Sequence, residues 1–96
     1  MSRTAPRMIA TALEGLTAAL APATTLARVQ AVWAQAAGPA IATAARPTGE
    51  RQGVLTVTCD AAVWAQELDL MSLELIPRIN SALGSEAIRE LRCRTG

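Results

Sequence analysis

The sequence predicts a small α+β domain of two layers, with helices packed on one face of a three-stranded mixed sheet. Residues 54–59 alternate apolar and polar side chains, and this period of two is typical of a half-buried strand. Apolar residues at helical spacing follow at once. The link from this strand to a last predicted strand, at 87–94, is long enough for a crossover, so the two can pair in parallel.

The N-terminal part of the chain is predicted to be helical. We expect residues 1–6 to be flexible and residues 7–95 to form one domain. A first helix is predicted over residues 7–21, and Pro22 stops it. Its apolar face consists of Ile9, Leu13, Leu16 and Leu20.

A second helix is predicted to begin after a threonine cap, at Thr24 or Thr25. The Gly38–Pro39 pair ends it, and residues 40–44 are compatible with one further turn. Its apolar side carries Leu26, Val29, Val32, Trp33 and Ala36.

The first two strands are predicted to form a hairpin. Residues 44–48 are expected to be an edge strand, because Pro47 cannot donate a hydrogen bond to a neighbouring strand. Residues 49–53 are interpreted as the turn that joins this strand to residues 54–59.

The long helix after the hairpin is expected to begin at Asp60, whose carboxylate can cap the first turn. Its apolar face is predicted to carry Val63, Trp64, Leu68, Met71, Leu75 and Ile79. Pro77 removes one helical hydrogen bond, so a kink or break is expected near residues 73–77, and the helix ends around Gly84. The last strand is predicted to begin near Ile88. In it, Leu91 and Cys93 should point inward and Arg92 and Arg94 to the opposite face.

Composition excludes several classes of protein. Half of the residues are apolar, yet Phe, Tyr and His are absent. A stacking surface of the type used by single-strand-binding sheets is therefore largely excluded, and the usual general base is missing. No apolar run approaches the ~20 residues of a membrane span, and a cytoplasmic protein without cofactor, metal or small-molecule substrate is expected. Two cysteines are too few for a disulfide framework.

The tryptophans and cysteines each have two interpretations. Trp64 and Trp33 are predicted to be core anchors, with a base-stacking platform as the alternative. Cys59 and Cys93 are predicted to be small buried hydrophobes, reduced and unpaired. The alternative is a redox pair on neighbouring strands, which a cytosolic compartment disfavours.

The net charge of +1 is unevenly distributed, and every cation is arginine. Residues 60–77 contain four acids and no base, whereas the segments on either side are net positive. Three acids of the long helix form either a solvated face or a docking surface for a basic partner: Glu67, Asp69 and Glu74. Five arginines form either scattered charge or a phosphate-binding patch: Arg46, Arg51, Arg89, Arg92 and Arg94.

Several segments together resemble the DciA family of bacterial proteins. They are Trp33 with Gly38, Arg46–Pro47, GVLTV at 53–57, AVWAQEL at 62–68, Arg78–Ile79–Asn80 with Leu83–Gly84, and LRCR at 91–94. The resemblance covers about residues 7–95. It implies a domain similar to the KH (K-homology) fold and a part in loading or operating the replicative DNA helicase.

The chain departs from that pattern in two respects. KH domains that bind nucleic acid clamp its backbone with a GxxG loop. Here Gly49 and Gly53 are one residue too far apart and fall in the predicted hairpin, so the clamp is not carried over. Many family members also carry a polar extension beyond this domain, which these 96 residues do not include.

The sequence therefore predicts a non-enzymatic DNA-replication accessory module. The five arginines are expected to bind single-stranded or duplex DNA weakly and with strong salt dependence, and the three acids to bind the replicative helicase. No membrane contact is expected. The alternatives are a KH-like RNA-binding adaptor and a protein-interaction domain without a nucleic-acid role, which the near-neutral charge favours.

Overall fold

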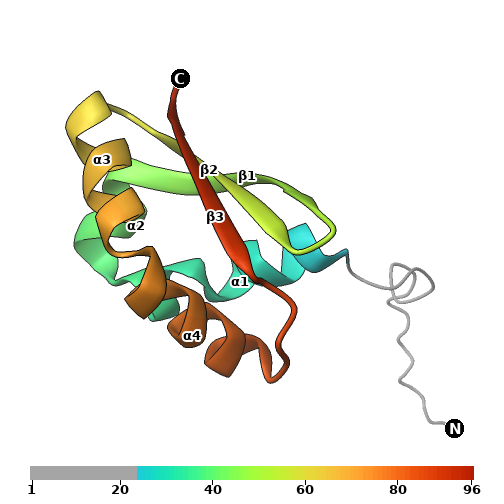
Figure 1. Cartoon of the computed structure of the whole chain (residues 1–96). Coiled ribbons are helices and arrows are strands. Elements are labelled where there is room, and N and C mark those ends of the chain that lie inside the picture. Colours follow the sequence, from blue (N-terminus) through green and yellow to red (C-terminus); the bar gives the residue numbers. More distant parts are fainter. Residues whose placement is uncertain (1–23) are drawn as a thin grey trace, which may run out of the picture.

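The computed structural model describes residues 24–96 and shows three strands beside a layer of helices (Figure 1). The elements, in chain order, are α1 (Thr25–Ala37), α2 (Pro39–Ala44), β1 (Ala45–Arg51), β2 (Val54–Cys59), α3 (Ala62–Leu70), α4 (Ser72–Leu83) and β3 (Glu90–Thr95). The predicted flexible segment 1–6 and the helix predicted over 7–21 lie outside the described residues.

The sheet confirms the predicted topology. Its strand order is β1-β2-β3, with β1 antiparallel and β3 parallel to the central strand β2. Strand β1 is at an edge, as Pro47 requires, and the pairing shifts between Pro47 and Gly49. The fold is thus an α+β, two-layer domain, consistent with a small KH-like domain.

The core lies between the helices and one face of the sheet. Leu55 and Val57 of β2 are fully buried and form one cluster with buried residues of the helices, including Leu75 and Ile79 of α4. Trp33 is only 4% exposed, and its indole Nε1 donates to the carbonyl of Ala45 at 2.8 Å. The first described helix is capped as predicted, because the Thr24 hydroxyl accepts from the N–H of Ala27 at 3.0 Å.

The hairpin turn is tighter than predicted. Strand β1 continues to Arg51, and only Gln52 and Gly53 stand between the two strands. Both have positive φ, 53° and 86°, which suits a two-residue turn that follows the twist of the strands. The Glu50 carboxylate also accepts from the N–H of Gly53 at 2.8 Å, so the predicted turn residues 49–51 can remain in the strand.

Asp60 does not cap the long helix, contrary to the prediction. The cap position is Ala61, and no side chain caps this helix. The N–H of Asp60 still donates to the carbonyl of Ala44, which keeps the chain extended for one more residue. Its carboxylate instead accepts from Arg46 Nη2 at 2.9 Å.

The predicted interruption of the long helix is present, but it lies at Met71, before the window 73–77. The N–H of Met71 closes α3, and its carbonyl accepts the first hydrogen bonds of α4. Pro77 is inside α4. It deprives the Leu73 carbonyl of its helical partner, but Leu73 is 87% exposed and water can serve that carbonyl.

Strand β3 starts later than predicted. Residues 87–89 are not part of it, because Asn80 holds both backbone polar groups of Ile88. Gly84 ends α4 in the left-handed conformation, as expected of a glycine after a helix.

Candidate nucleic-acid and partner interfaces

The sheet has a second face, opposite the core. Side chains alternate along a strand, so the residues that alternate with the buried Leu55, Val57 and Leu91 point away from the helices. We call this second face the open face. The register arranges its residues in three rows across the sheet: Arg51–Val54–Glu90, Gly49–Thr56–Arg92 and Arg46–Thr58–Arg94.

The open face collects four of the five predicted arginines. Arg46 and Arg51 come from β1, and Arg92 and Arg94 come from β3, on the far side of the central strand. All four are exposed. Arg89 stands apart because it precedes β3, and its Nε donates to the Gln52 carbonyl in the hairpin turn at 2.9 Å.

The arginines differ in how far they are already neutralised. Arg46 pairs with Asp60 at 2.9 Å, and Arg89 Nη1 is 4.0 Å from a Glu90 carboxylate oxygen. Within residues 24–96, Arg51, Arg92 and Arg94 make no ion pair. Their guanidinium groups are the ones most available to an anionic ligand.

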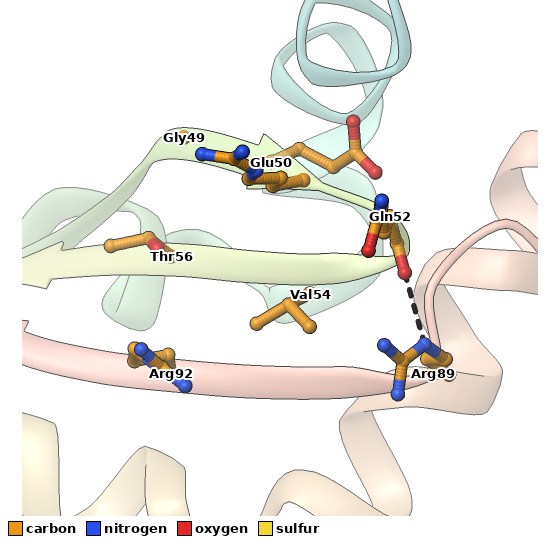
Figure 2. Close-up of a pocket in the computed structure, with 8 residues that line it drawn as sticks. Gly49, Glu50, Gln52, Val54, Thr56, Arg89 and Arg92 are labelled. Carbon is orange, nitrogen blue, oxygen red and sulfur yellow. Dashed lines mark hydrogen bonds between the residues drawn. The ribbon is translucent and has the colours of Figure 1, made fainter.

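A surface depression lies where the hairpin meets β3 (Figure 2). Figure 2 shows Thr56 between Gly49 and Arg92, with Arg89 pointing toward Gln52. The depression is lined by Gly49, Glu50, Arg51, Gln52, Val54, Thr56, Arg89 and Arg92. Its single carboxylate, on Glu50, is held by the N–H of Gly53.

The predicted acidic residues lie on the helical side of the molecule. Glu67 and Asp69 belong to α3 and Glu74 to α4, and all three are exposed. No arginine or lysine forms an ion pair with them among the residues described. The negative charge is therefore separated from the arginines of the open face.

Three exposed apolar side chains accompany these acids and were missed by the sequence prediction. Val63 is 62%, Leu70 78% and Leu73 87% exposed. Val63, Glu67 and Leu70 follow one side of α3 at spacings of four and three. The prediction placed Val63 in the core, and this is wrong. Leu70 and Leu73 fall out of phase with the buried Leu68 and Leu75, which was the available signal.

The tryptophan prediction is confirmed fully at one position and partly at the other. Trp33 is buried, whereas Trp64 is half-buried and packs against the edge of the core. Both belong to helices, so neither supplies a stacking surface on the open face.

The cysteines are free and lie on the inward side of neighbouring strands. Cys59 is buried as predicted, whereas Cys93 is only half-buried. Burial raises the pKa of the Cys59 thiol. The pKa of Cys93 is raised to about 11, mainly by burial and to a smaller extent by the nearby Cys59 and Asp69. At neutral pH both thiols are protonated, and a protonated thiol is a poor nucleophile.

The part of the chain that the structure describes has neither a metal-binding cluster nor a membrane-spanning helix. Within residues 24–96, no three His, Cys, Asp or Glu side chains gather closely enough to hold a metal ion. None of the helices there is long and apolar enough to cross a membrane.

Comparison with known families gives a match over most of the chain. The model of the family described as Dna[CI] antecedent, DciA, matches residues 7–93. The chain belongs to the DciA family. The DciA match includes β1, β2, α3 and α4, and β3 as far as Cys93, and so covers the acidic residues and every arginine of the open face except Arg94.

Curated relatives of this DciA chain include proteins of Rhodococcus and Mycobacterium species. It is 37% identical over 60 residues to UPF0232 proteins of Rhodococcus jostii and Mycobacterium tuberculosis, which is 62% of this chain and 32% of each relative. A UPF0232 protein of Mycobacterium leprae is 37% identical over 65 residues, 68% of this chain and 34% of the relative. The chain thus spans about a third of the length of the curated relatives it matches.

Proposed function

We propose that this DciA-family chain is a non-enzymatic accessory module of DNA replication that assists loading of the replicative helicase. One observation carries the nucleic-acid part of the proposal: the register places Arg46, Arg51, Arg92 and Arg94 on a single sheet face. Residues separated by some forty positions in the sequence thereby form one basic surface. Family membership supports the link to helicase loading.

The chemistry of the open face favours weak binding that is independent of base sequence. Arginine binds phosphate through a planar pair of donors, and phosphate contacts carry no direct base information. The affinity should fall steeply with salt, because each neutralised phosphate releases counterions. Arg46 is already paired with Asp60, so only a few arginines are available and the affinity should be modest.

We assign the helicase contact to the acidic side of α3 and α4. Glu67, Asp69 and Glu74 provide negative charge, and the exposed Leu70 and Leu73 provide apolar area beside it. The complementary surface is a basic segment that also presents apolar side chains. A helicase bound there would leave the open face accessible to DNA.

The proposal is tested by two binding measurements on the wild-type protein. Titration of single-stranded DNA, duplex DNA and RNA over a range of salt concentrations should give binding that weakens with salt. A pull-down should capture the cognate replicative helicase. Preference for RNA without helicase capture would indicate an RNA-binding adaptor. Helicase capture with no nucleic-acid binding at low salt would leave only a protein-interaction domain, which the net charge of +1 favours.

A further inference from the structure

The middle of the open face carries hydroxyl groups rather than charges. Thr56 and Thr58 lie on the central strand, between the arginines of β1 on one side and those of β3 on the other. Thr48 lies beside Thr58, with their hydroxyl oxygens 2.7 Å apart. The three threonines, Thr48, Thr56 and Thr58, form what we call the hydroxyl lane.

The hydroxyl lane has donors to offer. When the Thr48 and Thr58 hydroxyls bond to each other, one donates and the other accepts, so the accepting hydroxyl keeps its own proton free. The Thr56 hydroxyl has no hydrogen-bond partner among residues 24–96. Gly49, directly across from Thr56, has no side chain that could cover it. At least two O–H donors can therefore point away from the sheet.

Acids close both ends of this lane. Asp60 pairs with Arg46 at one end, and Glu90 lies in the row with Val54 and Arg51 at the other. Glu90 also lies 4.0 Å from Arg89. An anionic chain should therefore bind above the two positions between these acids, where Thr56 pairs with Arg92 and Thr58 pairs with Arg94 across the strands.

We propose that the hydroxyl lane holds the sugar–phosphate backbone of one DNA strand, running along β2, a refinement that rests on the proposed nucleic-acid function. The hydroxyls on the central strand donate to phosphate oxygens, and Arg92 and Arg94 on the neighbouring strand β3 neutralise the charge of the same phosphates. Strands lie about 4.8 Å apart, so the arginine-bearing strands β1 and β3 are separated by about 10 Å, room for one backbone between them.

Two features favour a single strand over a duplex. A sheet is twisted, and a flexible single strand can follow the twist, whereas a duplex is stiff over about 150 base pairs and would touch fewer phosphates. The open face also has no aromatic side chain, so its contacts are to the backbone and the bases face solvent. Binding should therefore be indifferent to base identity.

Neutral hydroxyls and charged arginines leave different signatures in a salt titration. Removing an arginine that contacts phosphate lowers the affinity and flattens the dependence of the binding constant on salt. Removing a hydroxyl lowers the affinity but displaces no counterion, so the salt slope should not change. This difference separates the role of the lane from the general role of the basic surface.

The decisive experiment compares Thr56→Val/Thr58→Val with the wild type by fluorescence anisotropy of a labelled oligothymidine, over a range of salt. Valine matches threonine in shape and suits a strand. We expect about tenfold weaker binding with an unchanged salt slope. Thr56→Ser/Thr58→Ser keeps the hydroxyls and should bind nearly as the wild type does. Thr95→Val is the matched control, since Thr95 is an exposed strand threonine in the opposite phase of β3 from Arg94.

The outcomes separate this inference from the proposed function. If wild-type protein binds DNA and loses affinity in Arg92→Ala/Arg94→Ala, but the valine pair binds like Thr95→Val, the hydroxyl lane is wrong and the basic surface stands. If a duplex binds as tightly as the single strand, the single-strand assignment is wrong. If wild-type protein binds no nucleic acid at low salt, both proposals fail. If the valine pair does not fold, near-wild-type binding by an alanine pair, Thr56→Ala/Thr58→Ala, overturns the lane.

Discussion

Asn80 and Ile88 are joined by two hydrogen bonds through a single side chain. Asn80 Nδ2 donates to the Ile88 carbonyl at 2.8 Å, and the N–H of Ile88 donates to Asn80 Oδ1 at 2.9 Å. Asn80 is 5% exposed and is the one buried polar side chain in the core of residues 24–96. It fastens the end of α4 to the segment that leads into β3, and so fixes where the arginines of β3 begin.

Asn80→Ala should therefore destabilise the fold by about 2–4 kcal/mol, because it leaves both backbone groups of a buried residue without a partner. Denaturant unfolding measures this change. Ser81→Ala, at the neighbouring exposed position, is the control and should cost little. A loss below about 0.5 kcal/mol for Asn80→Ala would mean that water replaces the amide and that the pair does not hold the segment.

The two tryptophans should differ in their contribution to stability. Trp33 is buried and donates to the Ala45 carbonyl, so Trp33→Ala should cost about 3–5 kcal/mol. Trp64 is only half-buried, and Trp64→Ala should cost less than Trp33→Ala does. Urea unfolding of the two variants decides the order. An equal or greater loss at Trp64 would mean that Trp64 anchors the core as firmly as Trp33 does, despite being only half-buried.

The thiols should be reactive only at high pH. The pKa of Cys93 is raised to about 11 from an ordinary value of 9.0. A raised pKa means that folding favours the protonated thiol, so this contribution to stability is complete below pH 9 and is lost as the pH rises through 11. Alkylation of native protein should be slow at neutral pH and accelerate through this range. Thiol counting after unfolding should find two free thiols, and a count of zero in a monomer would indicate an internal disulfide.

The order of elements was predictable from the sequence because it depends on local periodicity. The alternation over residues 54–59 and the helical spacing of Leu68, Leu75 and Ile79 both correspond to buried faces. The errors arose where a contact distant in sequence decides the outcome. Asp60 was predicted to be a cap because it precedes a helix, but the guanidinium of Arg46, fourteen residues away, binds its carboxylate.

The candidate surfaces were less predictable than the fold. The alternation of Leu91 and Cys93 with Arg92 and Arg94 indicated an exposed face. Only the register shows that Thr58 separates Arg94 from Arg46. The exposure of Leu70 and Leu73, by contrast, was open to prediction, because both are out of helical phase with the buried Leu68 and Leu75.

Helicase capture should depend on the acidic side of α3 and α4. Glu67→Lys/Glu74→Lys reverses two exposed charges and should weaken the pull-down of the helicase, because a basic partner would then be repelled. Leu70→Ser/Leu73→Ser should weaken it as well, with little loss of stability, since both leucines are exposed. Glu86→Lys is a matched control outside these two helices. Undiminished capture by both double variants would place the helicase contact elsewhere.

DNA binding should depend on the arginines of β3. Arg92→Ala/Arg94→Ala removes two exposed guanidinium groups that make no ion pair within residues 24–96, so the fold should remain intact. We expect weaker binding to all sequences about equally, and a log–log salt slope flatter by about one to two units, roughly one per lost phosphate contact.

Arg28→Ala/Arg78→Ala is the control, because it removes the same charge from α1 and α4. If both pairs reduce binding equally, net charge is responsible, whereas an unchanged titration of the β3 pair at low salt would exclude the open face as the nucleic-acid site. Helicase capture by the β3 pair should match the wild type, because its acidic surface is untouched.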